Sequence, residues 1–168
     1  MEPNELRTIQ APLKERYEAE PDAALVTLSA HGELGEGVSC SIDSGRALAE
    51  AGLHPASGGD GSLLCSGDML LEALAACAGV TLRAVATSLG IAVASGTVTA
   101  EGDLDFRGTL AVDRDAPVGF RAIRLSFELD SEASEEELAT LLKLTERYCV
   151  VLQTLASPPQ LSASLKTA

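Results

Sequence analysis

The chain has 168 residues, a length for which a single domain with its own hydrophobic core is the default expectation. Its formal net charge of −13 argues against a nucleic-acid partner, because phosphate binding needs clusters of lysine and arginine. The charged N-terminal stretch has no apolar signal segment, and no uncharged run reaches the roughly eighteen apolar residues of a membrane span. Its four cysteines form no CxxC pair. We therefore expect a cytoplasmic protein with reduced thiols, no membrane contact and no zinc site.

The first third of the sequence predicts an arm and short strands. Residues 1–23 are charged and contain prolines, which indicates an extended or partly helical arm. Strands are expected over 24–30 and 37–43, on either side of a glycine-rich turn. In the second strand the alternation of apolar and polar residues turns Cys40 inward, where a small core side chain is the simplest interpretation. A short helix over 44–53 and a glycine-rich loop should follow.

A long apolar helix is predicted next, with Ser66 as its N-cap and Gly90 as its stop. Cys77 lies near the middle of this helix, on a stripe of mostly small apolar side chains. Such a stripe is typical of a buried face, so another element should pack close to Cys77.

The remainder of the chain predicts two strands, a second helix and a last strand. Residues 97–108 and 121–129 alternate between apolar and polar side chains, as half-buried strands do. The second helix should begin at Ser134, where Glu137 completes a capping box, and its apolar face carries Leu141, Leu142 and Cys149. A final strand is expected over 160–165. This order predicts an α+β fold in which a mostly antiparallel sheet packs with two main helices.

The two helices present one cysteine each, and two interpretations remain open. Cys77 and Cys149 are either small core side chains or a redox pair whose helices face each other. A reactive thiol must ionise, which requires a cation supplied by the fold, with Arg16 and Arg46 as candidates. Cys65, directly before the helix start, is a rival thiol. Acyl transfer with His31 or His54 is less favoured, since neither has an evident orienting partner.

Two stretches, SGDMLLEALAACAGVTL and ERYCVVLQTL, resemble the cysteine motifs of the OsmC-like family, which includes the organic hydroperoxide resistance proteins. The resemblance covers about residues 24–166, which divides the chain into an N-terminal arm (1–23) and an OsmC-like domain (24–168). It implies an intertwined homodimer and a thiol peroxidase without metal or other cofactor. Cys77 would attack an organic hydroperoxide, Cys149 would resolve the sulfenic acid as a disulfide, and a dithiol reductant would restore both thiols.

Three positions depart from the family pattern. The turn SAHGELGEG contains no arginine to activate the first thiol, and His31 could supply positive charge there only when protonated. Asp68 replaces a glutamate in the first turn of the long helix. Val150 replaces the proline after the second cysteine, so we expect the helix to continue through Cys149. The alternative function is an OsmC-fold protein that binds a small apolar ligand without peroxidase turnover.

Overall fold

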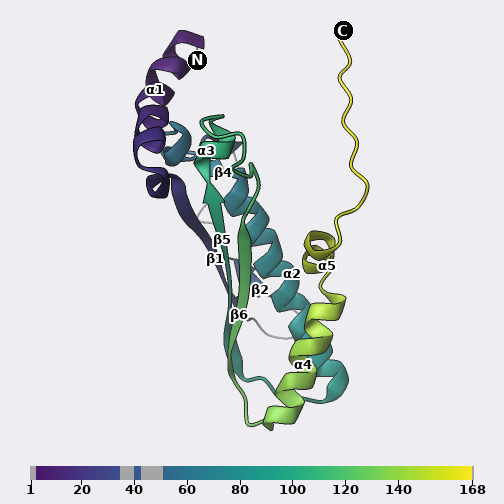
Figure 1. Cartoon of the computed structure of the whole chain (residues 1–168). Coiled ribbons are helices and arrows are strands. Elements are labelled where there is room, and N and C mark those ends of the chain that lie inside the picture. Colours follow the sequence, from purple (N-terminus) through teal and green to yellow (C-terminus); the bar gives the residue numbers. More distant parts are fainter. Residues whose placement is uncertain (1–2, 35–39, 43–50, 168) are drawn as a thin grey trace.

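The computed structural model describes residues 3–34, 40–42 and 51–167 of the chain (Figure 1). Its elements in chain order, with η for short 3-10 helices, are α1 (Pro3–Ala19), η1 (Pro21–Ala24), β1 (Leu25–Leu34), β2 (Cys40–Ile42), β3 (Ala51–Gly52), η2 (Pro55–Ser57), β4 (Leu64–Cys65), α2 (Ser66–Leu89), β5 (Ser95–Asp105), α3 (Phe106–Thr109), β6 (Ala122–Asp130), α4 (Glu135–Tyr148) and α5 (Val150–Ala156).

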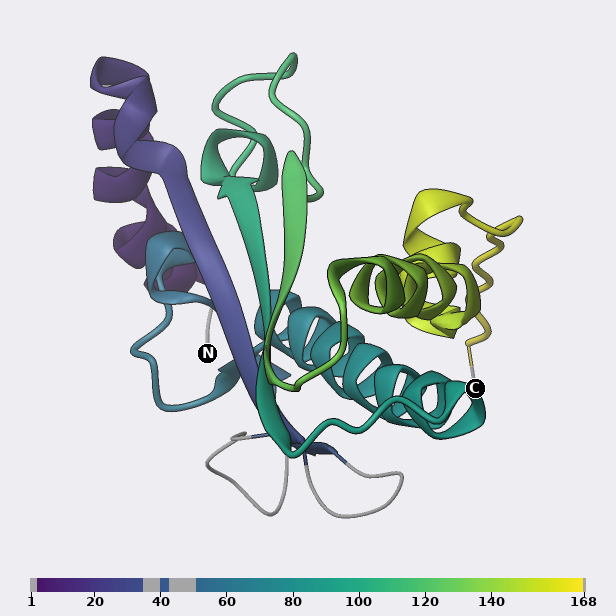
Figure 2. The ribbon, with the colours of Figure 1, turned by 90° about the horizontal axis from the view of Figure 1, so that it is seen from below.

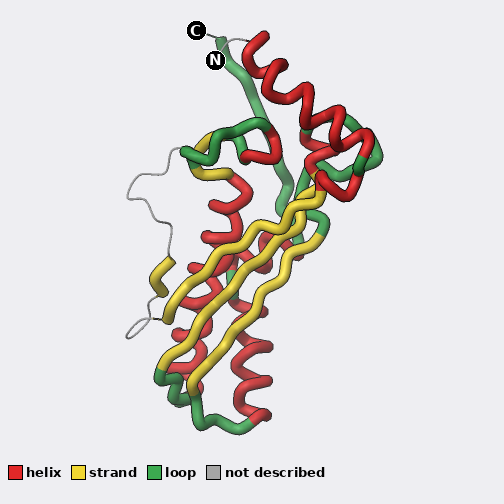
Figure 3. Tube along the Cα trace, turned by 90° about the vertical axis from the view of Figure 1, so that its left-hand side faces the viewer, coloured by secondary structure: helices red, strands yellow, loops and turns green. Residues whose placement is uncertain are grey.

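The main sheet is antiparallel, with strand order β2-β1-β5-β6. The ladder between β1 and β5 runs from the pair Leu25–Asp105 to the pair Glu33–Thr97, and the ladder between β5 and β6 is equally long. Helix α2 packs on β1 and β5, and α4 packs on α2, so both helices lie on the same side of the sheet (Figures 2 and 3). The predicted α+β fold with a mostly antiparallel sheet and two main helices is therefore confirmed.

The core lies between the sheet and α2, where the alternation predicted from the sequence is observed. Val98 and Ala100 of β5 are completely buried, and every second residue of β6 faces the helices. The small residues of α2 allow the helix to approach the sheet closely, because they add little bulk between backbones. The buried cluster contains Leu71, Leu74, Ala75, Ala78, Leu82, Val85, Ala86, Val93, Val98, Ala100, Leu141 and Cys149.

The limits of the two main helices follow their capping residues. Gly90 ends α2 in the left-handed conformation, with a φ of 70°, as predicted. The capping box between Ser134 and Glu137 opens α4, also as predicted. The length and apolar composition of α2 would also allow it to cross a membrane. Its packing against the sheet and α4 is instead that of a core helix.

One predicted element lies mostly outside the described residues, and another is not formed. Most of the predicted helix over 44–53, including Arg46, lies outside the described residues, and Ala51–Gly52 forms the short strand β3. Residues 160–165 form no strand, and Leu161 and Leu165 are 83% and 92% exposed. A strand needs a neighbouring edge for its hydrogen bonds, and this tail leaves α5 without running beside the sheet (Figure 1).

The N-terminal arm is mostly helical and packs on the body of the protein. Helix α1 contacts η2 and α3. The Tyr17 hydroxyl donates a hydrogen bond to the carbonyl oxygen of Ala56 at 2.7 Å, and the Gln10 amide donates to that of Ser57 at 3.1 Å. The arm therefore braces the turn at residues 54–57.

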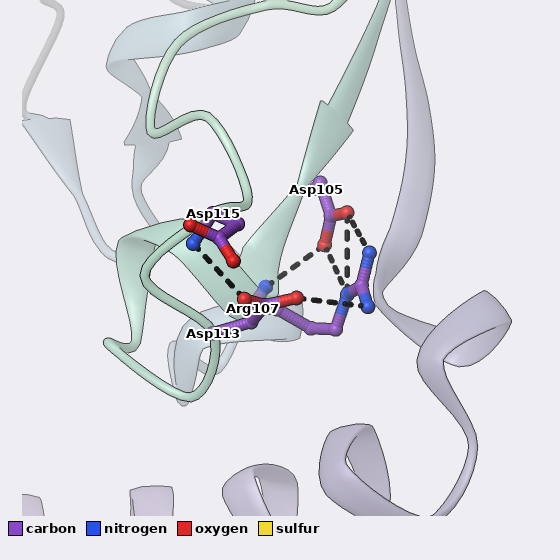
Figure 4. Close-up of polar contacts among 4 residues, drawn as sticks. All are labelled: Asp105, Arg107, Asp113 and Asp115. Atoms are coloured by element: carbon purple, nitrogen blue, oxygen red, sulfur yellow. Dashed lines mark hydrogen bonds and ion pairs between the residues drawn. The ribbon is translucent and has the colours of Figure 1, made fainter.

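A buried ion pair fixes α3 at the end of β5 (Figure 4). The Asp105 side chain is buried and accepts hydrogen bonds from the backbone N–H of Arg107 and from its guanidinium, the shortest at 2.6 Å. Asp113 contacts the same guanidinium at 3.3 Å. The bond from Arg107 lowers the pKa of Asp105, because it stabilises the ionised carboxylate. This clamp positions the neighbouring Phe106.

Candidate functional site: the Cys77–Cys149 thiol pair

The structure brings Cys77 and Cys149 together. Cys77 lies on α2 and is half-buried, whereas Cys149 is fully buried between α4 and α5. The two thiols are close enough that a hydrogen bond between them contributes to the pKa of each. The apolar face predicted for the second helix, which the structure divides between α4 and α5, therefore contacts the face of α2 that carries Cys77.

The helix does not continue through Cys149 as expected, although no proline follows it. Cys149 has φ −70° and ψ 106°, which ends α4 at Tyr148 and starts α5 at Val150. In a continuous helix the N–H of Val150 would bond the carbonyl of Glu146. That carbonyl instead accepts a hydrogen bond from the side-chain amide of Gln153 at 2.8 Å. The side chain of Gln153 thus compensates the break and leaves the first N–H groups of α5 available.

These freed N–H groups act on Cys77. Burial raises the pKa of the Cys77 thiol, because it disfavours the charged form. Hydrogen bonds from the backbone N–H of Val151, the Cys149 thiol and the Thr81 hydroxyl lower it, with a smaller contribution from the N–H of Val150. The donors together outweigh burial, so the pKa of Cys77 lies below the ordinary value for cysteine.

Cys149 is shifted in the opposite direction. Burial raises the pKa of its thiol to about 11, and the charge on Cys77 adds to this effect. The shifts of the two thiols have opposite directions, so Cys77 is the one that ionises more readily. The pair is therefore asymmetric: the half-buried Cys77 thiol ionises more readily than an ordinary cysteine, and the fully buried Cys149 thiol beside it ionises less readily.

The expected cation is not found beside Cys77 among the described residues. Neutral donors, rather than a lysine or arginine, are the main groups that lower its pKa. Arg83, on the same helix, donates to the carbonyl of Val93 at 2.5 Å, and Arg16 lies on α1. His31 contacts Thr99 at 3.3 Å on the face of the sheet opposite α2, so it cannot supply charge to Cys77.

The roles of Thr81 and Gln153 were not predicted from the sequence. For Thr81, the available signal was its position one helical turn after Cys77.

The other sequence candidates lie elsewhere. Cys65, not Ser66, is the N-cap of α2, and its sulfur accepts a hydrogen bond from the N–H of Gly67 at 3.4 Å. Asp68 precedes Cys77 by nine residues, which is about 13 Å along a helix, so it is not part of the thiol pair. Burial raises the pKa of Asp68, because it disfavours the ionised carboxylate. The Cys40 side chain is outside the described part of the chain.

Metal ligation is not supported where the structure can be examined. Within residues 3–34, 40–42 and 51–167, no group of three or more histidine, cysteine, aspartate or glutamate side chains is placed to hold a metal ion.

Substitution of Thr81 by valine should raise the pKa of Cys77, because it removes one donor to the thiolate while keeping the shape of the side chain. The midpoint of Cys77 alkylation by iodoacetamide, followed against pH by peptide mapping, should move upward. Thr87→Val is the matched control, since that hydroxyl bonds the Arg83 carbonyl on the exposed part of α2. Equal midpoints in both variants would show that Thr81 does not act on the thiolate.

The family model described as "OsmC-like protein" matches residues 59–164. An OsmC-like hydroperoxide resistance protein from Jannaschia sp. CCS1 has a similar structure, with a TM-score of 0.62 and 19% identity, over 86% of this chain and 95% of that one. An OsmC-like protein from Mycoplasma pneumoniae gives a TM-score of 0.56 and 22% identity, over 80% of this chain and 86% of that one.

A search of curated proteins found no match. The two structural similarities establish a shared fold, and the family model covers more than half of the sequence, including both cysteines of the pair. The chain belongs to the OsmC-like protein family.

Proposed function

We propose that this protein is a thiol-dependent peroxidase that reduces organic hydroperoxides, with Cys77 as the attacking thiol and Cys149 as the resolving thiol. The observation that carries the proposal is the asymmetric pair. The pKa of the more accessible Cys77 is lowered, whereas that of its buried neighbour is raised to about 11. A thiolate is the nucleophile in such chemistry, and a neighbouring thiol is needed to resolve the product.

The reaction can be written with these two residues. The Cys77 thiolate attacks the terminal oxygen of the hydroperoxide, the O–O bond breaks, and the alkoxide leaves as the alcohol after taking a proton. Cys77 is now a sulfenic acid. The Cys149 sulfur attacks the Cys77 sulfur, an S–S bond forms, and the hydroxyl group leaves as water with the thiol proton. A dithiol reductant then exchanges with this disulfide and restores both thiols.

Exposed apolar side chains near the pair support an organic substrate. Tyr148 and Val150, on either side of Cys149, are 57% and 70% exposed. An alkyl or aryl hydroperoxide could bury its apolar part there, which hydrogen peroxide cannot do.

The same surface and the exposed leucines of the C-terminal tail support a homodimer, in which a second copy covers them. We place this protein in the cytoplasm, where resting thiols stay reduced.

Intact mass after mixing reduced protein with one equivalent of cumene hydroperoxide tests the proposal. The parent should lose two hydrogens rapidly, and peptide mapping should place a disulfide between Cys77 and Cys149. Cys77→Ser should remain reduced, and Cys149→Ser should stop at a sulfenic acid that dimedone traps on Cys77. A parent that stays reduced over minutes, or a bridge through Cys65, would contradict the assignment.

A further inference from the structure

A cavity lies at the N-terminal end of α2, whereas the thiol pair lies near the middle of that helix. It is bounded by the η2 turn, the first residues of α2, α3 and the loop before β6, and its volume is about 410 Å³. Its walls are largely apolar, with Leu70, Phe106 and Phe120 among the lining residues, and its polar side chains include His54 and Cys65. Cys65 precedes Cys77 by twelve residues, about 18 Å along a helix, so this cavity is separate from the pair.

Three contacts hold the part of the cavity wall that carries His54: a ring stack, a hydrogen bond and an ion pair. The His54 ring stacks on Phe106, with ring centres 5.0 Å apart. The carbonyl of Ala56, two residues later, accepts the hydrogen bond from Tyr17 of the N-terminal arm. The ion pair between Asp105 and Arg107 fixes the start of α3, and with it Phe106. The arm, which lies outside the residues matched by the family model, therefore shapes the cavity.

The hydrogen bond that the His54 ring accepts shows which of its two nitrogens is free of a proton. Nδ1 accepts a hydrogen bond from the N–H of Ala56 at 3.0 Å, so this nitrogen carries no proton. In the neutral form of the ring the proton is therefore on Nε2, which makes His54 a hydrogen-bond donor on the wall of a largely apolar cavity. A carbonyl oxygen is the matching acceptor.

Cys65 adds a nucleophilic atom to the same cavity. Its sulfur accepts the hydrogen bond from Gly67 at the start of α2, and its side chain is half-buried among the lining residues. Apolar walls, a donor for a carbonyl oxygen and a thiol together suit an α,β-unsaturated aldehyde with a hydrocarbon chain.

We propose that this cavity binds 2-alkenals and that Cys65 adds to them. The hydrocarbon chain packs on Phe106 and Phe120, and the carbonyl oxygen accepts a hydrogen bond from His54. The Cys65 sulfur forms a bond to the β-carbon, the C=C double bond becomes single, and the thiol proton ends on the α-carbon. This addition involves no oxidant or reductant, and it is independent of the Cys77–Cys149 pair.

Rates of adduct formation at Cys65, measured by peptide mapping on the reduced full-length protein, test the proposal with trans-2-nonenal and 2-butenal as probes. The longer aldehyde should react about tenfold faster or more, with saturation, because its additional methylene groups are buried in the cavity. Iodoacetamide reports the general accessibility of the thiol.

Gly119 offers a blocking substitution and a matched control. A Cβ atom at Gly119, which lines the cavity, would meet no atom within 4 Å, and the backbone there is not in the left-handed region. Gly119→Trp should remove the preference for trans-2-nonenal, whereas Gly119→Ala should keep it. Val118→Trp, at another exposed lining position, is the second blocking variant should Gly119→Trp melt below the parent temperature. Equal rates for the two aldehydes at Cys65, a preference unchanged in the tryptophan variants, or adducts only at other cysteines would overturn the proposal.

Discussion

Replacing Cys77 by serine should lower kcat/KM for an organic hydroperoxide by about a thousandfold or more, because a serine hydroxyl is not ionised near neutral pH and lacks the nucleophilicity of a thiolate. In the parent, the rate of the first oxidation should rise with pH through the lowered pKa of Cys77 and then level off. Stopped-flow measurement with one equivalent of hydroperoxide over a pH series gives both quantities.

Two further variants separate the roles of the thiols. Cys149→Ser should keep a fast first oxidation but fail to turn over with a dithiol reductant, because no disulfide forms. Cys65→Ser should retain full activity, since Cys65 lies at the start of α2, away from the pair. Activity retained in Cys77→Ser, or lost in Cys65→Ser, would assign the attacking thiol to a different residue.

Substitution of Leu141 by alanine should destabilise the protein by about 2–5 kcal/mol, because it removes a buried side chain and leaves a cavity. Leu141 is 1% exposed and belongs to the core cluster between α2 and α4. Leu142, its neighbour, is 44% exposed. Leu142→Ala should therefore cost less than about 1 kcal/mol and is the matched control.

Urea denaturation followed by circular dichroism measures both free energies of unfolding. Loosened packing of α4 should also weaken the contact between α5 and Cys77, so the pKa of Cys77 in Leu141→Ala should move toward the ordinary value. If Leu141→Ala and Leu142→Ala lowered the free energy of unfolding by similar amounts, α4 would not pack on α2 through the face that carries Leu141.

The thiol pair was only partly predictable from sequence. Helical periodicity placed Cys77 and Cys149 on apolar faces, and the family motifs assigned them to one site. The break at Cys149 was not predicted. It depends on the hydrogen bond from the Gln153 side chain to the carbonyl of Glu146, and no local sequence pattern predicts that contact. The break frees backbone N–H groups at the start of α5. These neutral donors lower the pKa of Cys77, where the sequence had suggested a cation.

Periodicity also could not separate adjacent residues near the edge of a buried face. Leu141 and Leu142 both fit the apolar stripe of α4, yet only Leu141 reaches the core. The tail at 160–165 has the alternation of a strand, but a strand forms only where a neighbouring edge supplies hydrogen bonds. His54 had no visible orienting partner in the sequence, because Phe106 and the brace from Tyr17 are distant along the chain.

Local sequence information was sufficient for the class of fold, the end of α2 at Gly90, the start of α4 at Ser134 and the assignment to a family. These features follow from local information: apolar periodicity, the capping box at Ser134, the stop at Gly90 and two cysteine motifs. The donors that lower the pKa of Cys77, and the cavity that Cys65 shares with His54, became visible only in the folded chain. Both depend on groups that are far apart along the chain and meet only when the helices pack on the sheet.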